Sequence, residues 1–209
     1  DAAQGIWLSN SGAVPLRAQV RVQQWTQTNG VERLQPTRDL VASPPVLEIA
    51  PGERQMVRVV RLQTGAPAQE QAYRLLLDEL PADTQAPGAA AATGLQFLLR
   101  HSVPMFVVPQ GAKPLGGRAG TTDTAALSAL ATPAPDGVQL AVGNTGSQRV
   151  RLSQLAFVDA QNQATPLVPG LLGYVLAGQN MQWPLRLTPE QLRNGGQFKA
   201  RLNDDLEPQ

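Results

Sequence analysis

Short runs of alternating apolar and polar residues recur along this chain, and proline or glycine separates one run from the next. In residues 17–23, Ala18, Val20 and Val22 fall on one face and charged or amide side chains on the other. This period of two predicts a half-buried strand. With 18 prolines and 19 glycines interrupting the runs, few segments are long enough for helices, and the pattern is typical of an all-β sandwich protein.

The same pattern predicts further strands along the chain. They are Gly5 to Ser9, Val46 to Ile49, Met56 to Leu62, Val150 to Val158, Tyr174 to Leu176, Met181 to Leu187 and Gln197 to Leu202. Residues 73–80 (YRLLLDEL) have helical propensity, but the run is short and ends at Pro81, so a strand is predicted there too. Thr188 to Glu190 reads as a turn or the start of a short helix.

Two features predict two domains. The glycine-rich stretch after Pro109 reads as a linker, so we place the domains at 1–110 and 111–209. Within the first of them, residues 82–94 (ADTQAPGAAAATG) read as a long mobile loop. The second half repeats the first in one respect: a strand followed by Asn-Ser-Gly at 10–12 corresponds to a strand followed by Asn-Thr-Gly at 144–146. Asn and Gly are common in turns for general reasons, so the boundary and the match are taken together.

Charge and composition exclude several classes of function. The 17 basic and 16 acidic residues give a net charge of +1 without long runs, which argues against a nucleic-acid surface or a polybasic membrane anchor. The absence of cysteine excludes disulfides and thiolate metal sites. No apolar run approaches the roughly 20 residues of a membrane span, so no membrane insertion is expected, and any export signal is expected to have been removed before Asp1.

No catalytic, metal or cofactor site is predicted. The single histidine, His101, leaves no histidine cluster and is most simply a strand residue. Asp78 and Glu79 are adjacent, so in a strand they point to opposite faces and cannot act as a carboxylate pair. Asp204 and Asp205 lack the acidic spacing of a calcium loop.

Residues 95–109 (LQFLLRHSVPMFVVP) are unusually apolar and contain Pro104. Proline cannot donate a ladder hydrogen bond, so it indicates an edge strand or a bulge. Leu95, Phe97 and Leu99 share one face of the predicted strand. Either the strand belongs to the core of a sandwich, or it is an exposed edge that adds itself to the sheet of another protein.

The sequence resembles the pilus-assembly chaperones of the chaperone-usher pathway, and more closely their archaic, Csu-like branch. The matching stretches lie in order across the first half: GIWLSNSG, AQVRVQQW, SPPVLEIAPGERQMVRV, EQAYRLLLDELP and LQFLLRHSVPMFV. The second half matches more loosely, through GNTG and LLGYVLAG.

The resemblance implies an all-β fold of two immunoglobulin-like β-sandwich domains in an L-shaped arrangement, located in the periplasm. It implies that the last strand of the first domain is donated to an incomplete pilus subunit, which is then delivered to an outer-membrane usher. The donor side chains would be Leu95, Phe97 and Leu99, with His101 and Val103 as continuations. The family's first strand is absent from this sequence. If it is missing from the protein, weaker subunit binding and self-pairing of the first domain are expected.

The resemblance also points to an anchor for the C-terminal carboxylate of the subunit. Better-known members use a lysine of the donor strand, and that position falls on Pro104. In the archaic branch an arginine of the Tyr-Arg-Leu strand takes this role, which corresponds to Arg74, with Arg100 as a second candidate. An arginine fork suits a carboxylate. The alternative is that Arg74 is simply an outward-facing strand arginine.

The leading functional hypothesis is therefore a non-enzymatic periplasmic chaperone for pilus subunits, with no cofactor. The alternative is a structural or adhesive surface protein built of two immunoglobulin-like modules. A carbohydrate-processing sandwich enzyme is disfavoured because the sequence offers no suitable pair of carboxylates.

Overall fold

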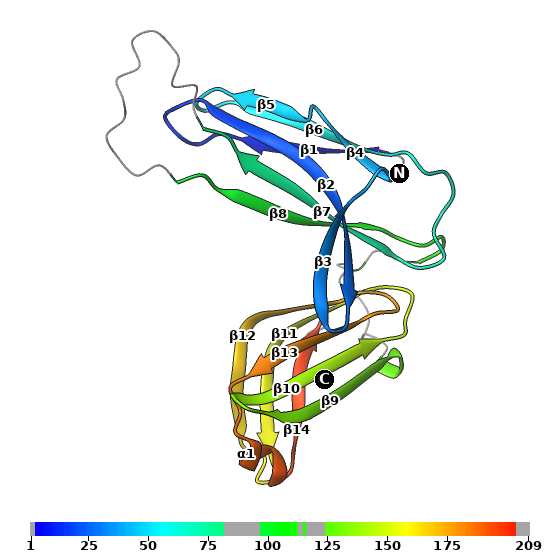
Figure 1. Cartoon of the computed structure of the whole chain (residues 1–209), viewed down its shortest axis with the longest axis vertical. Coiled ribbons are helices and arrows are strands. Elements are labelled where there is room, and N and C mark those ends of the chain that lie inside the picture. Colours follow the sequence, from blue (N-terminus) through cyan, green and yellow to red (C-terminus); the bar gives the residue numbers. More distant parts are fainter. Residues whose placement is uncertain (1–2, 82–96, 113–114, 116–123, 204–209) are drawn as a thin grey trace. The chain divides into compact units, whose positions relative to one another are not determined.

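The structure is a computed structural model that describes residues 3–81, 97–112, 115 and 124–203 (Figure 1). In these residues strands dominate, and the helical elements are α1 (Pro189–Arg193) and a 3₁₀ turn at Thr124–Ala126. The all-β prediction is confirmed. By packing, the chain divides into two compact units. The first holds 1–25, 34–65 and 73–105, and the second holds 26–33, 66–72 and 106–209. The predicted domain boundary at residue 110 stays a prediction.

Two sheets make up most of the first unit. One has the order β1 (Ala3–Ser9), β6 (Arg54–Arg61), β4 (Leu40–Ser43). The other has the order β3 (Val31–Pro36), β2 (Leu16–Thr28), β7 (Gln71–Glu79), β8 (Arg100–Val107), and β5 (Val46–Ile49) also pairs with β2. The end of β2 and the start of β3 belong to the second unit. Leu8 on the first sheet and Leu77 on the second line the same pocket, so the sheets face each other across an apolar interior.

The alternation in sequence sets the inward faces of these sheets. Ala18 and Val20 of β2 are buried and Val22 is half-buried, as the period of two predicts. Residues 73–79 lie in β7, which confirms the strand predicted for this segment, and Leu80 follows the end of the strand. In β7, Tyr73, Leu75 and Leu77 are buried, and neighbouring strands lie on both sides. Burial between two neighbours therefore overrides the helical propensity of its leucines.

The second unit contains a sandwich of two sheets. One has the order β13 (Asn180–Leu185), β10 (Gly137–Asn144), β9 (Leu127–Ala134). The other has the order β12 (Ala164–Val175), β11 (Val150–Asp159), β14 (Gly196–Leu202). Leu140 and Leu185 from the first sheet pack with Leu152 and Val175 from the second in one core. Helix α1 begins after Thr188, whose side chain and that of Gln191 form a capping box. The predicted helix start at this position is confirmed.

The two Asn-x-Gly turns noted in the sequence have the same hydrogen bonds. Asn10 accepts from the amide of Gly12 at 2.9 Å and donates from its side-chain amide to the carbonyls of Val14 and Ile49. Asn144 accepts from Gly146 at 2.9 Å and donates to the carbonyls of Gln148 and Val175. Each asparagine thus ties its turn to a distant strand end, so the sequence match reflects a repeated structural device.

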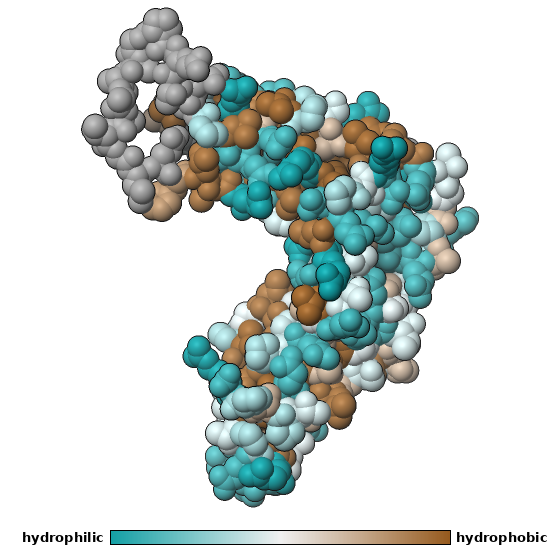
Figure 2. Space-filling model, viewed as in Figure 1, coloured by the Kyte–Doolittle hydropathy of each residue, from teal (hydrophilic) through white to brown (hydrophobic). Residues whose placement is uncertain are grey.

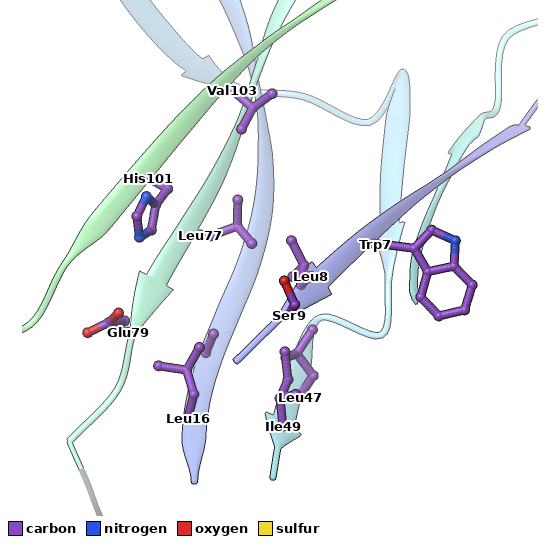
Figure 3. Close-up of a pocket in the computed structure, with 11 residues that line it drawn as sticks. Trp7, Leu8, Ser9, Leu16, Leu47, Ile49, Leu77, Glu79, His101 and Val103 are labelled. Carbon is purple, nitrogen blue, oxygen red and sulfur yellow. The ribbon is translucent and has the colours of Figure 1, made fainter. Parts of the chain in front are cut away.

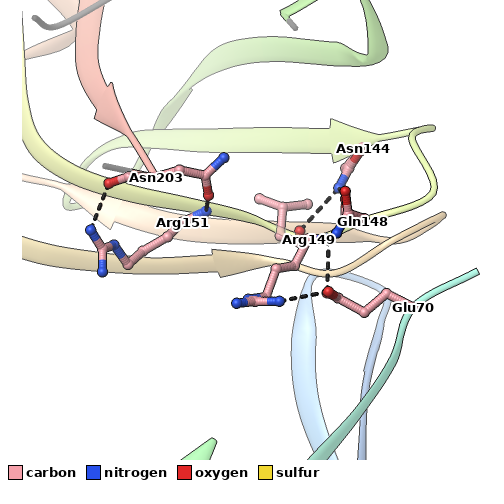
Figure 4. Close-up of polar contacts among 7 residues, drawn as sticks. Glu70, Asn144, Gln148, Arg149, Arg151 and Asn203 are labelled. Atoms are coloured by element: carbon pink, nitrogen blue, oxygen red, sulfur yellow. Dashed lines mark hydrogen bonds and ion pairs between the residues drawn. The ribbon is translucent and has the colours of Figure 1, made fainter. Parts of the chain in front are cut away.

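Figure 4 shows a buried ion pair in the second unit. The Glu70 carboxylate accepts from the Arg149 backbone amide at 3.0 Å and from its guanidinium at 2.6 Å. The Arg149 guanidinium also lies 3.5 Å from the centre of the Phe106 ring. Burial raises the pKa of Glu70 and lowers the pKa of Arg149, because each charge is removed from water. The pair thus fixes residues 66–72 to this unit.

Several strands were not predicted from the sequence. They are β3, β4, β9 and most of β12, where only Tyr174 to Leu176 was expected. All six residues of β3 are exposed, so it has no apolar alternation to detect. β9 and β12 are edge strands that contain prolines, which an edge tolerates but a pattern search reads as an interruption.

Candidate functional site

Strand β8 lies at the edge of its sheet. It pairs with β7, and no other described strand pairs with it. The edge position predicted from Pro104 is therefore confirmed. The expected extent is corrected, because the strand begins at Arg100 and Phe97 to Leu99 precede it. β7 ends at Glu79, whose amide donates to the carbonyl of Leu99 at 2.9 Å, and the described residues Phe97 and Leu98 lie outside any strand. Leu95 lies outside the described residues.

Three of the predicted donor residues form an exposed apolar series. Phe97 is 76% exposed, Leu99 is 54% exposed and Val103 is 38% exposed. Figure 2 shows hydrophobic patches between polar ones on the surface of the unit that contains β8. Apolar side chains this exposed beside an unpaired strand edge are the combination that another chain can cover.

The two faces of β8 differ in what they contact. Arg100 forms an ion pair with Asp78 on one face. His101 and Val103 point to the other face, where they line a pocket of about 300 Å³ with Leu77 and Glu79. Asp78 and Glu79 thus face opposite ways, as predicted.

The pocket opens between the edge strands of the two sheets of the first unit. Its lining comes from β1, β2, β5, β7 and β8 and is largely aliphatic, with Leu8, Leu16, Ala18, Leu47, Ile49, Leu77 and Val103 among its residues. In Figure 3 His101 and Val103 come from β8 and Leu77 and Glu79 from the neighbouring strand β7, whereas the indole of Trp7 is turned away from the other labelled side chains. The pocket continues the apolar series of β8 into the interior of the unit.

Arg74 lies on β7, on the face opposite to this pocket. It is directly opposite Gln23 of β2 and is half-buried. The carbon atom of its guanidinium lies 3.7 Å from the centre of the Trp25 ring. Trp25 is 1% exposed, so the guanidinium rests on a fixed aromatic surface.

Arg100, the second anchor candidate, is engaged by Asp78. The other carboxylate oxygen of Asp78 accepts from Arg21 at 2.5 Å, so one carboxylate connects β2, β7 and β8. These two arginines hold the pKa of Asp78 below its ordinary value, with Arg21 making the largest contribution. Arg100 therefore has a structural partner within the sheet.

Two residues of this site escaped the sequence analysis. Asp78 is considered in the sequence only as half of a rejected carboxylate pair, and Trp25 appears there only within the stretch AQVRVQQW. Their contacts depend on the pairing register of β2 and β7, which puts Gln23 opposite Arg74 and Gln19 opposite Asp78. Without that register, nothing in the sequence predicts which residues Asp78 and Trp25 contact. In the described part of the chain, no group of three or more His, Cys, Asp or Glu side chains could hold a metal ion.

The fold and the exposed edge strand are those of a strand-donating β-sandwich protein, and the family comparison agrees. Residues 1–113 match the family model of the pili and flagellar-assembly chaperone, PapD N-terminal domain. The chain therefore belongs to the pili and flagellar-assembly chaperone family. This confirms the predicted chaperone function, and the alternative of a structural or adhesive surface protein is not favoured.

Solved structures with the same fold include several chaperones. The CsuC–CsuE chaperone–tip adhesion subunit complex of archaic Csu pili of Acinetobacter baumannii matches with a TM-score of 0.71 and 22% identity, covering 100% of this chain and 89% of that chain. The CupB2 chaperone of Pseudomonas aeruginosa matches at 0.59 and 15%, covering 100% and 90%. The SafA pilin–SafB chaperone complex of Salmonella enterica matches at 0.61 and 15%, covering 98% and 86%.

Among curated proteins none matches this chain. In the described residues, no helix is long and apolar enough to span a membrane.

Proposed function

We propose that this protein is a periplasmic chaperone of the archaic, Csu-like branch, which holds a pilus subunit by adding β8 to the incomplete sheet of that subunit. It acts by binding alone, without catalysis, and hands the subunit to an outer-membrane usher. The observation that carries the proposal is the exposed apolar series at the edge strand β8, in a chain of the pilus chaperone family.

The donor residues in this proposal are Leu95, Phe97 and Leu99, continued by His101 and Val103. Burial of a leucine or phenylalanine contributes roughly 1.5–3 kcal/mol before ordering costs. Three or four such side chains, together with backbone hydrogen bonds along β8, are enough for a stable complex. The likeness to complexes of chaperones with a pilin or a tip subunit supports a pilus subunit as the partner.

Arg74 is the proposed anchor for the C-terminal carboxylate of the subunit. Its support is chemical: a planar fork of N–H donors matches a carboxylate, and the guanidinium of Arg74 lies over the ring of Trp25. Arg100 is the weaker candidate because it pairs with Asp78. The likeness to the Csu chaperone supports the archaic branch, in which Arg74 would take this role.

The test is recovery of a subunit complex from the periplasm. A pilus subunit encoded beside the gene for this protein is co-expressed with the wild type or with the variant Phe97→Asp/Leu99→Asp, and the complex is isolated and identified by mass spectrometry. We expect the variant to lose the complex, because charged side chains cannot fill apolar pockets of the subunit.

The matched control is Leu130→Asp. Leu130 is 64% exposed and lies on β9, which is also an edge strand. This variant should retain the complex. Undiminished recovery with Phe97→Asp/Leu99→Asp would show that the apolar segment leading into β8 does not bind the subunit.

A further inference from the structure

Trp25 and Arg74 lie on the same face of the second sheet of the first unit. Gln23 is directly opposite Arg74 in the register of β2 and β7, and Trp25 follows two residues later, so the indole is a diagonal neighbour of the guanidinium. Such neighbours are within reach of an aromatic side chain, and the separation is 3.7 Å. Trp25 is 1% exposed, so its ring lies in a buried environment.

The chemistry of this stack favours a particular orientation of the arginine. A guanidinium stacks by its flat face, and its N–H groups then point outward in the plane of the stack. An ammonium group has no such plane. A buried ring beneath the guanidinium therefore reduces the rotamers that Arg74 samples and lowers the cost of ordering it when a carboxylate binds.

Asp78 lies on the same face of β7 as Arg74, and its carboxylate already has two partners. Its two oxygens accept from Arg21 and from Arg100.

We infer that Trp25 is a positioning residue, which orients the guanidinium of Arg74 toward the C-terminal carboxylate of a bound subunit. The inference rests on the proposed anchoring role of Arg74. It assigns to a buried tryptophan a part in recognising the end of the subunit chain, in addition to its packing in the sheet.

The test measures discrimination between two forms of one probe. The probe is the pilus subunit recovered with the wild type, produced with its native C terminus and with a short glycine extension that displaces the carboxylate. The ratio of the two Kd values reports recognition of the chain end. A general loss of packing would raise both Kd values together and leave their ratio unchanged. A charge-assisted hydrogen-bond pair predicts a ratio of about ten to a hundred for the wild type.

Four variants separate the roles. Trp25→Phe keeps an aromatic surface and should retain most of the ratio, whereas Trp25→Leu should reduce it about tenfold. Arg74→Ala should bring the ratio to about one. Trp7→Leu is the matched control, because Trp7 carries a similar stack with Arg54 at 4.6 Å on the other sheet, and its ratio should not change.

The outcomes distinguish this inference from the function on which it rests. A folded Trp25→Leu variant with an unchanged ratio overturns the positioning role while the Arg74 anchor stands. An unchanged ratio in Arg74→Ala removes the anchor itself, and with it the inference.

A measurement on the unaltered sheet covers the case in which Trp25→Leu does not fold. The protein has three tryptophans, so 5-fluorotryptophan labelling gives three ¹⁹F signals, which Trp7→Phe and Trp183→Phe assign. The Trp25 signal should shift on binding the native subunit and shift less with the extended form. Equal shifts with both forms overturn the inference.

Discussion

At the scale of single residues, the ion pairs of this protein have two different roles. Glu70 and Arg149 form a pair that is removed from water, so its loss leaves a charge without compensation. Asp78 instead connects three neighbouring strands through Arg21 and Arg100, whose guanidinium groups remain exposed. The first kind governs stability, and the second governs how firmly the start of β8 is held to the sheet.

Glu70→Ala should destabilise the second unit strongly. Removing one partner of a buried pair costs about 3–5 kcal/mol, because Arg149 stays largely buried. The measurement is urea unfolding followed by the fluorescence of Trp183. The control Glu48→Ala alters an exposed residue of β5 and should change stability by less than about 0.5 kcal/mol. Full recovery of stability in Glu70→Leu/Arg149→Met would fit this account, whereas a neutral Glu70→Ala would contradict it.

Asp78 should make stability depend on acidity. Its pKa is lower in the folded chain than its ordinary value of 3.8, so its stabilising contribution is present above that value. The contribution is lost as the pH falls through the lower, folded-state pKa. The difference in Tm between wild type and Asp78→Asn should therefore be largest near neutral pH and disappear in strong acid. The control is Asp136→Asn, in the turn before β10. If the difference in Tm from wild type varied with pH in the same way for both variants, Asp78 would not be the source of the effect.

At the scale of elements, the same device closes a turn in each unit. A buried asparagine accepts from the amide two residues later and donates to two carbonyls, one of them at the end of a distant strand. A buried backbone carbonyl without a hydrogen-bond partner lowers the stability of the folded protein. We therefore expect these two asparagine side chains to contribute strongly to the free energy of unfolding.

Asn10→Ala and Asn144→Ala should each cost about 1–3 kcal/mol, since each leaves a buried carbonyl without its donor. Chemical denaturation of each variant gives the value. Ser11→Ala is the control, because Ser11 is an exposed residue of the same turn. If the asparagine variants were as stable as the serine variant, the turns would not hold the strand ends.

At the scale of the whole molecule, the chain has two packed units, and each has its own buried side chains. Proteins with more than one such unit commonly depart from two-state unfolding. The tryptophans report on them separately, because Trp7 and Trp25 belong to the first unit and Trp183 to the second.

Calorimetry should accordingly resolve two component transitions. Asn10→Ala should lower the transition of the first unit more, and Asn144→Ala that of the second, because each residue ties strands within its own unit. In a Trp183→Phe background the remaining tryptophans, Trp7 and Trp25, belong to the first unit, so the fluorescence change identifies the transition of that unit. Equal shifts of both transitions in both variants would mean that the chain unfolds as one cooperative body.

The sequence by itself determined the features that depend on local pattern. Alternation predicted most strands, Pro104 predicted the edge position of β8, and Asn-x-Gly predicted turns that proved equivalent. Each follows from the chemistry of one short segment. Strand β3 escaped because its side chains are all exposed, and the length of β8 was overestimated because its partner β7 stops at Glu79. Tertiary structure alone decided which charges and rings meet, as for Arg74 on Trp25 and Arg100 on Asp78. Those contacts depend on strand register, which is set by the packing of two sheets rather than by any single strand.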